Sequence, residues 1–136
     1  MSDDGYFGIA GVMVNTTPER WPAMRRFYVE VLGLTPRTLR DGFVSFQWGV
    51  EPHDTRLTVT VHSEVAGGAT DPVRILLNLG VDDIDAVARR IAASDGTFLR
   101  PPSQERWGGW IATLVDPDGN YVQLMQPTPV ASKMAP

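Results

Sequence analysis

The stretch Asp116-Pro117-Asp118-Gly119-Asn120 constrains the fold of this chain more than any other. Proline at the second position of a turn fixes φ, and Gly-Asn supplies residues that tolerate a positive φ. The flanking segments, 110–115 and 121–125, are apolar and β-prone, so the stretch predicts a hairpin. On residue chemistry alone it is a well-specified turn without a chemical role. The exception is Gln123, a polar residue that alternates with Val122 and Leu124 along the second strand.

Composition limits the classes of function. A chain of 136 residues is long enough for one domain, and 43% hydrophobic with 21% charged residues is typical of globular proteins. A net charge of −4, with no basic run longer than two residues, argues against a nucleic-acid partner. No apolar run reaches membrane-spanning length, and the first residues are acidic, so we expect neither a membrane partner nor a signal peptide. Without cysteine there is no disulfide or thiolate site, and a cytoplasmic location is the default expectation.

The first half predicts a strand, a helix and three further strands. Thr16, three residues before Glu19, and Pro18 are helix-start signals, although Pro22 leaves a later start open. Gly33 is expected to end the helix in a left-handed conformation, and Asp41-Gly42 predicts a hairpin. The apolar helix stripe is expected at Trp21, Met24, Tyr28 and Val31, and the strands at residues 7–14, 38–40, 43–48 and 57–62.

The second half repeats this order of elements. A strand at 74–79 precedes a helix that starts at Asp82-Asp83 and stops at Asp95-Gly96. A short strand at 97–99, a loop at 101–109 and the hairpin of residues 110–125 follow. We therefore predict a single α+β domain of two βαβββ modules, at about 7–64 and 73–126. The segment 63–71, which contains Gly67-Gly68, is expected to be a flexible connector, and the tail 127–136 to be disordered.

Two motifs in this context carry a family resemblance. The segment Phe27-Tyr28-Val-Glu-Val-Leu-Gly-Leu34 and the final Asp-Pro-Asp-Gly-Asn turn resemble the vicinal oxygen chelate superfamily of glyoxalases, bleomycin-resistance proteins, extradiol dioxygenases and fosfomycin-resistance enzymes. The resemblance covers residues from about 7 to 126. It implies modules whose curved mixed sheets surround a cavity, and a homodimer in which modules of different chains often complete each cavity.

The resemblance also implies where a metal would be held. Family enzymes chelate a divalent cation with His, Gln or Glu from the first and last strands of each module. The matching positions here are Gly11 or Met13, Thr58 or Thr60, Leu76 and Gln123. These residues offer no carboxylate or imidazole, which are the donors that hold a catalytic divalent cation. We therefore expect no metal and no other cofactor, and a cavity used for binding, as in the bleomycin-resistance branch.

Candidate ligand-binding residues follow from side-chain chemistry. His62, predicted on a polar strand face, could act as a base or donor, or be a half-exposed strand histidine; a site of His53, His62 and Glu64 matches no known metal spacing. The full candidate set is Trp48, Thr60, His62, Trp107, Trp110 and Gln123, in which the indoles could stack on a planar ligand.

Three functions remain open on these grounds. The first is a metal-independent protein that binds a small molecule, for example by sequestering a planar antibiotic or metabolite. The second is an enzyme of the same superfamily, a lyase, isomerase or dioxygenase-like protein in which His62 or Gln123 takes part in catalysis. The third is a dimeric interaction module without a ligand cavity.

Overall fold

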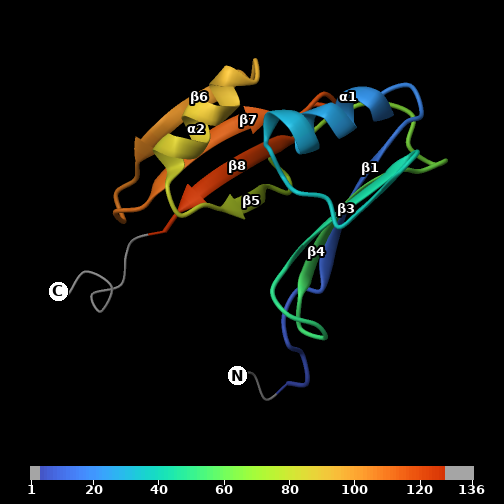
Figure 1. The fold of residues 1–136 in the computed structure, drawn as a ribbon, viewed down its shortest axis with the longest axis horizontal. Helices are drawn as coiled ribbons and strands as arrows, with labels where there is room; N and C mark the ends of the chain where they lie inside the picture. The colour runs from blue at the N-terminus through green and yellow to red at the C-terminus, as the bar shows by residue number, and fades with distance from the viewer. Residues whose placement is uncertain (1–3, 128–136) are drawn as a thin grey trace. The chain divides into compact units, whose positions relative to one another are not determined.

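The computed structural model describes residues 4–127 and divides the chain into two compact units, unit 1 up to Gly67 and unit 2 from Gly68. Within the described range each unit contains one four-stranded sheet, in the order β1-β4-β3-β2 in unit 1 and β5-β8-β7-β6 in unit 2 (Figure 1). In each sheet the first and last strands of the unit are parallel neighbours and the other pairings are antiparallel. The predicted α+β fold with two mixed βαβββ sheets is confirmed.

The elements of unit 1 follow the predicted order. They are β1 (Gly11–Thr16), α1 (Trp21–Arg25), the π-helical segment η1 (Arg26–Val31), β2 (Thr38–Arg40), β3 (Phe43–Trp48) and β4 (Thr55–Val61). The π-helical geometry is visible in the bond from the Leu32 N–H to the Phe27 carbonyl oxygen, 2.8 Å, which spans five residues. Gly33, with φ of 76°, ends this segment as predicted, and Gly42, with φ of 77°, closes the β2–β3 hairpin.

The elements of unit 2 are β5 (Leu77–Gly80), α2 (Ile84–Ala93), β6 (Phe98–Gln104), β7 (Trp110–Val115) and β8 (Tyr121–Gln126). Asp83 caps α2, because its carboxylate accepts the Ala86 N–H at 3.1 Å. A second contact comes from β8, where the Gln126 side-chain oxygen accepts the Ile84 N–H at 2.8 Å. The start of α2 is therefore tied to the sheet that it covers.

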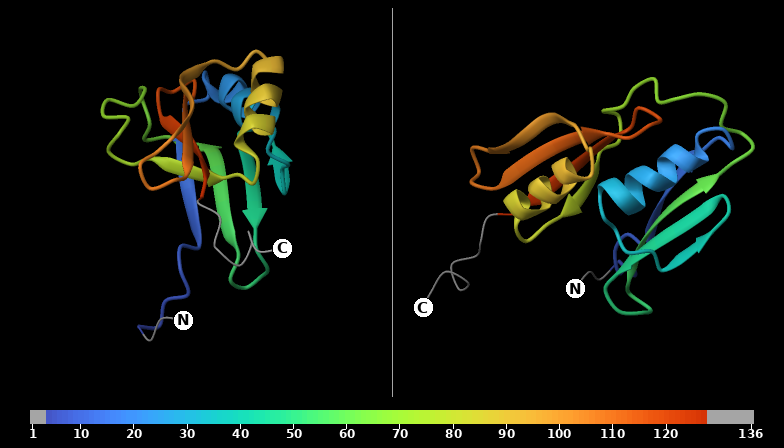
Figure 2. Two further views of the ribbon diagram at one scale, coloured as in Figure 1. Left: turned by 90° about the vertical axis from the view of Figure 1, so that its left-hand side faces the viewer. Right: turned by 45° about the horizontal axis from the view of Figure 1, so that its top comes forward.

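One face of each sheet is covered by the helix of its own unit, as both views in Figure 2 show for α2. In unit 1 the covered face carries Val44, Phe46, Leu57 and Val59, which are buried together with Met24 and Tyr28 of the helical segment. In unit 2 it carries Ala112, Leu114, Val122 and Leu124, buried with Ile84 and Ile91 of α2. The predicted helix stripe of Trp21, Met24, Tyr28 and Val31 is buried, because these side chains fill the space above the sheet.

The start of α1 agrees with the later start that Pro22 left open and differs from a start at residues 16–18. The helix begins at Trp21, and the Thr17 hydroxyl, not that of Thr16, accepts a backbone N–H, from Arg20 at 3.2 Å. Thr16 belongs to β1 and its side chain is fully buried, with a hydroxyl oxygen that has no hydrogen-bond partner in the described part of the chain. Pairing of β1 with β4 therefore places Thr16 in a strand, although the local sequence predicted that it would cap the helix.

Three strand predictions also need correction, the first being that β5 spans Leu77–Gly80 and not residues 74–79. β1 starts at Gly11 and not at residue 7, since its partner β4 begins only at Thr55 and gives the earlier residues no ladder. β6 continues to Gln104 through the region predicted as a loop, and it contains Pro101 and Pro102. Prolines are tolerated there because β6 is an edge strand and its pairing with β7 is interrupted by shifts of register.

The Asp-Pro-Asp-Gly-Asn turn is held by one side chain. Asp116 is 3% exposed; its Oδ1 accepts the N–H groups of Asp118 and Asn120, and its Oδ2 accepts the Asn120 side-chain amide, all at 2.9 Å. The connector also contacts this turn, because the Ala69 N–H donates to the Asp118 carbonyl oxygen at 2.8 Å. Part of the segment expected to be flexible is thus fixed to the turn.

The predicted disordered tail lies outside the described residues, apart from Pro127. No helix within residues 4–127 is long and apolar enough to cross a membrane.

Candidate functional site

In each unit the sheet face opposite the helix, here called the helix-free face, carries a row of aligned polar side chains. Side chains alternate between the two faces of a strand, so the residues between the buried positions point to the helix-free side. The rows occupy equivalent places in the two sheets, because both cross the four strands in the same order.

The unit 1 row consists of Met13, Thr58, Ser45 and Thr38, which are successive partners across β1, β4, β3 and β2. Its chemistry is one thioether and three hydroxyls. Met13 is 61% exposed at the edge strand, whereas Ser45 is only 5% exposed in the middle of the row. None of these side chains ionises at neutral pH.

The unit 2 row consists of Asn78, Gln123, Thr113 and Arg100, successive partners across β5, β8, β7 and β6. The Gln123 Nε2 group donates to the Thr113 hydroxyl oxygen at 3.3 Å, which fixes one end of the amide. Arg100 is brought opposite Thr113 by the irregularity in β6, and its Nη2 donates to Ser103 at 2.8 Å and to Glu105 at 2.6 Å. The row therefore has the neutral amide of Gln123 near its centre, and at one end the charge of Arg100, which Glu105 neutralises.

The strand registers show which residues lie next to the ligand positions that the family resemblance implies. In unit 1 the parallel strands pair Met13 with Thr58, and in unit 2 they pair Asn78 with Gln123. Asn78 is the strand neighbour of Gln123, and Leu76, the position that the resemblance implies, lies directly before β5 and offers no donor atom. A thioether, a hydroxyl and two amides are neutral, weak ligands for hard or borderline divalent cations. These residues do not fit the metal that family enzymes hold, and no group of three His, Cys, Asp or Glu side chains between residues 4 and 127 could hold one elsewhere.

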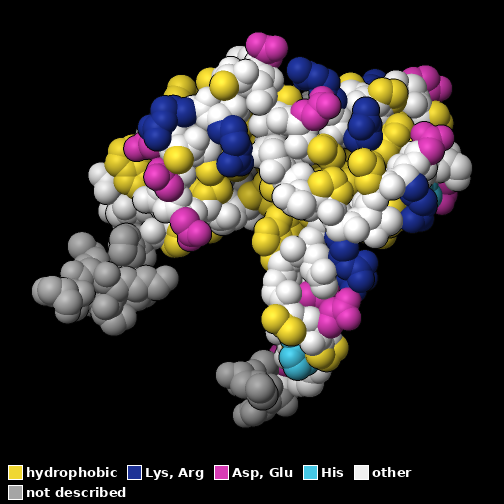
Figure 3. Space-filling view, in the orientation of Figure 1, with side chains coloured by type: hydrophobic (Ala, Val, Ile, Leu, Met, Phe, Trp, Pro, Cys, Tyr) yellow, Lys and Arg dark blue, Asp and Glu magenta, His cyan; other side chains and the backbone are white. Residues whose placement is uncertain are grey.

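An ion-pair cluster at one end of the unit 1 sheet was not anticipated. Asp54, 7% exposed, accepts hydrogen bonds from Arg56 Nε and Gln47 Nε2, both at 2.9 Å, while Glu51 pairs with Arg56 at 2.8 Å and Arg37 at 3.3 Å. The Arg56 bond and then the Gln47 bond lower the pKa of Asp54. Basic and acidic side chains lie next to each other on this part of unit 1 (Figure 3). Two cations face two anions, so the cluster offers no net charge to a ligand.

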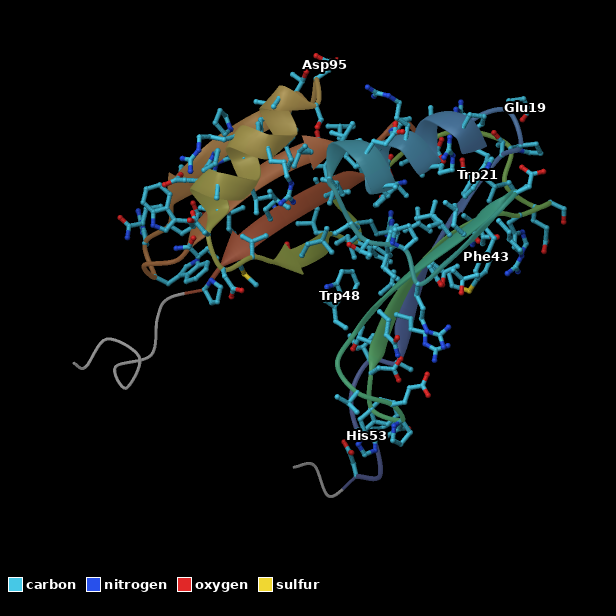
Figure 4. The ribbon with its side chains drawn as sticks, viewed as in Figure 1. Glu19, Trp21, Phe43, Trp48, His53 and Asp95 are labelled. Carbon is cyan, nitrogen blue, oxygen red and sulfur yellow. The ribbon has the colours of Figure 1, made fainter. Side chains whose placement is uncertain are left out.

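The two histidines lie at opposite ends of β4. His53 precedes the strand, with its ring 4.8 Å from that of Phe7, and His62 follows it. The seven residues of β4 rise by roughly 3.3 Å each, so the histidines are about 20 Å apart and cannot share a metal. Figure 4 shows His53 and Phe43 at the two ends of this sheet. His62 was predicted to end the strand at 57–62, but β4 ends at Val61, so His62 is exposed just beyond the strand, and its Nδ1 accepts the Glu64 N–H at 3.1 Å.

Thr60 and Trp48 are separated by the sheet of unit 1. The Thr60 hydroxyl donates to the Gly42 carbonyl oxygen at 3.1 Å, so it supports the β2–β3 hairpin. Trp48 is at the other end of β3, opposite Thr55, and shares with Val44 and Phe46 the face of the sheet that the helix covers. It is 44% exposed because it lies at the end of the strand, and it presents an indole surface that the core does not use fully.

Trp107 and Trp110 belong to the β6–β7 hairpin of unit 2. The Trp107 ring lies directly against Gly109, whose missing side chain leaves the space for it, and the ring is 52% exposed. The hairpin is closed by the bonds from Glu105 N–H to Gly109 oxygen, 2.8 Å, and from Gly108 N–H to Glu105 oxygen, 2.9 Å. Trp110 starts β7 on the side of Ala112 and Leu114. The structure therefore places Gln123 and Trp110 on opposite faces.

Of the six predicted ligand-binding residues, only Gln123 belongs to either polar row. The sequence signal for the missed Asn78 was available in the alternation Leu77-Asn78-Leu79, which repeats the pattern Val122-Gln123-Leu124. Thr113 and Arg100 could be found only after the register of β6, β7 and β8 was known, because a bulge separates Arg100 from the regular ladder.

Comparison with known proteins supports the architecture. A sequence model of the Glyoxalase/Bleomycin resistance protein/Dioxygenase superfamily matches residues 14–124. None of the curated proteins compared matches this chain.

Solved structures with the same fold have low sequence identity to the chain. A glyoxalase-related enzyme from Fulvimarina pelagi has a TM-score of 0.67 and 21% identity, over 88% of both chains. A glyoxalase/bleomycin resistance protein from Catenulispora acidiphila has a TM-score of 0.61 and 23% identity, over 88% of this chain and 96% of that one. A lactoylglutathione lyase from Agrobacterium tumefaciens has a TM-score of 0.65 and 19% identity, over 90% of this chain and 96% of that one.

Proposed function

Because the chain belongs to the glyoxalase/bleomycin resistance protein/dioxygenase superfamily, we propose that it is a metal-independent protein that binds a small molecule. The observation that carries this proposal is that the first and last strands of each unit pair neutral residues, Met13 with Thr58 and Asn78 with Gln123, in the region where the resemblance implies a metal. Neutral side chains at both places leave a surface suited to hydrogen bonding and unsuited to chelation.

The ligand in this proposal is planar and partly apolar, as an antibiotic or a metabolite can be. Trp107 is 52% exposed, and Trp48 is 44% exposed and presents an indole face that the core does not need and on which a flat ligand could stack. Sequestration of such a compound requires only binding, which is consistent with rows that contain no carboxylate or imidazole pair. We further propose a homodimer, for which light scattering should give twice the chain mass of 14.9 kDa.

Metal analysis of protein purified without chelators or added metal tests the proposal. The expected result is far less than one equivalent of any divalent transition metal per chain, both before and after dialysis against zinc followed by buffer. One tightly retained equivalent would overturn the metal-independent assignment. Ligand binding is then measured by tryptophan fluorescence with a panel of planar compounds, in the presence and absence of EDTA; equal affinities are expected.

A second candidate, an enzyme of the same superfamily, is favoured by one observation. The Gln123 amide is fixed by Thr113 and presents its other end to the helix-free face, as a donor or acceptor for a polarised carbonyl would. His62 is less suited to the role of base, because it is exposed and lies beyond β4. Should turnover of a compound from the binding panel be found, Gln123→Ala is expected to reduce kcat and His62→Ala to leave it unchanged.

A further inference from the structure

The unit 2 row has unused hydrogen-bonding capacity that is concentrated in two adjacent amides. Gln123 uses one N–H on Thr113, which leaves its carbonyl oxygen and its second N–H. Asn78 is exposed, and its side chain has no hydrogen-bond partner in the described structure. Neighbouring strands are about 4.8 Å apart, so the two amides stand side by side at a spacing that one small molecule can bridge.

The surface on either side of the row is apolar. On the helix-free face, Met125 and Ile111 are partners on one side of Gln123 and Thr113, and Tyr121 and Val115 are partners on the other. A flat ligand lying on this face would cover these side chains with its rings. Its polar edge would then meet the amides in an environment from which water is largely excluded, where each hydrogen bond contributes more.

The charge at the end of the row disfavours an acidic ligand. Arg100 is the row's cation, but its Nη2 lies 2.6 Å from the Glu105 carboxylate, whose side chain is only 24% exposed. A carboxylate ligand that approached Arg100 would also approach Glu105, and like charges at such distances repel. The row is therefore complementary to a neutral group.

An amide pairs best with a partner that presents a donor and an acceptor side by side in one plane. The same geometry lets Asn and Gln pair with the edge of adenine. We propose that Asn78 and Gln123 recognise a neutral planar ligand through a donor–acceptor edge of the lactam, imide or ureido type. This inference rests on the proposed metal-independent binding function and specifies the ligand class for it.

Three bicyclic probes of similar size test the inference. Isoquinolin-1-one is a lactam with the donor–acceptor edge, its N-methyl derivative lacks the donor, and 1-naphthoate is an anion. Binding is measured at millimolar probe concentrations by NMR, following the side-chain amide signals of Asn78 and Gln123. The lactam is expected to bind with the highest affinity of the three probes. Its N-methyl derivative should bind about tenfold more weakly, which corresponds to the loss of one good hydrogen bond.

Variants test whether the unit 2 row causes the preference for the lactam over its N-methyl derivative. Gln123→Met keeps the length of the side chain without its polar edge, and the preference for the lactam over its N-methyl derivative should fall to about unity. Asn78→Leu, at an exposed position that the core does not need, is expected to reduce the preference in the same direction. Asp82→Ala, at an exposed position of unit 2 outside both polar rows, is the control and should leave the preference unchanged.

The possible outcomes separate this inference from the proposed function. If lactam and N-methyl lactam bind equally, or if 1-naphthoate binds tightest, the donor–acceptor inference is overturned while metal-independent binding stands. The same inference is overturned if none of the probes shifts the Asn78 and Gln123 signals. If the lactam binds only after zinc is added, the metal-independent function itself fails.

Discussion

Replacement of Asp116 by alanine should destabilise unit 2 more than any other single change at its surface turns. The carboxylate is 3% exposed and accepts three hydrogen bonds at 2.9 Å, two from backbone N–H groups and one from the Asn120 side chain. Hydrogen bonds to a charged group contribute about 1.5–3 kcal/mol each, but bonds within one turn are not additive. We expect a loss of about 3–5 kcal/mol, a large part of the roughly 5–15 kcal/mol by which a domain is stable.

Two further variants make the Asp116 estimate specific. Asp116→Asn keeps one acceptor oxygen for the two backbone N–H groups, but its own NH₂ then faces the Asn120 NH₂, so an intermediate loss of about 2 kcal/mol is expected. Asp82→Ala is the control for loss of a carboxylate, since Asp82 is exposed and should change stability by less than about 0.5 kcal/mol. Stabilities are measured by urea denaturation, and hydrogen exchange at β8 reports whether the register after the turn is retained.

A small effect would refute this reasoning about the turn. If Asp116→Ala lost no more than Asp82→Ala, the turn would be specified by Pro117 and by Gly119, whose φ is 90°, and the carboxylate would be incidental.

Three other predictions follow from buried or aligned side chains. Thr16→Val should stabilise unit 1 by about 1 kcal/mol in urea denaturation, because it removes a buried hydroxyl oxygen without a described partner and keeps the shape; a destabilised variant would contradict it. Hydrogen bonds from Arg56 and Gln47 lower the pKa of Asp54 below its ordinary 3.8, so the unchanged chain should be more stable than the Asp54→Asn variant. This difference in the free energy of unfolding should be complete above about pH 5 and should shrink as the pH falls below 3.8 through the lowered folded-state pKa. An advantage independent of pH would refute the role of the charge. The double variant Asn78→His with Gln123→Glu should bind zinc at least about tenfold more tightly than the unchanged chain by calorimetry, since it places an imidazole and a carboxylate on paired strand positions; equal affinities would show that donor chemistry is not what excludes the metal.

The fold was largely readable from the sequence because its signals are local. The hairpin turns, the Gly33 helix end and the Asp83 cap depend on residues within a few positions of one another, and the structure agrees with each. The errors arose where pairing between distant residues decided the outcome. Thr16 was drawn into β1 by its register with β4, and β6 continued through two prolines because an edge strand leaves one side of its backbone unpaired.

The candidate site was less predictable, for a related reason. The predicted residues were chosen by type, so indoles and imidazoles came first, and most of them lie at strand ends or on different faces. The residues that do align across a sheet, such as Asn78 and Thr113, are ordinary types whose significance comes only from register. No local pattern identifies a bulge that brings Arg100 opposite Thr113.

Both sheets pair the first and last strands of their unit in parallel, and the middle residues of these strands, such as Met13, Thr58, Asn78 and Gln123, lie on the helix-free face. At positions without a metal this face could carry large apolar residues, as it does at Ile111 and Met125 beside the unit 2 row. Within the row it instead carries two amides, and one of them is oriented by a 5% exposed hydroxyl. Because the Asn78 and Gln123 side chains are not fully buried, water can satisfy their unused hydrogen-bonding groups when no ligand is bound. A solvated sheet face and a bound ligand both account for the polar character of the unit 2 row, and the preference for the lactam over its N-methyl derivative distinguishes the two.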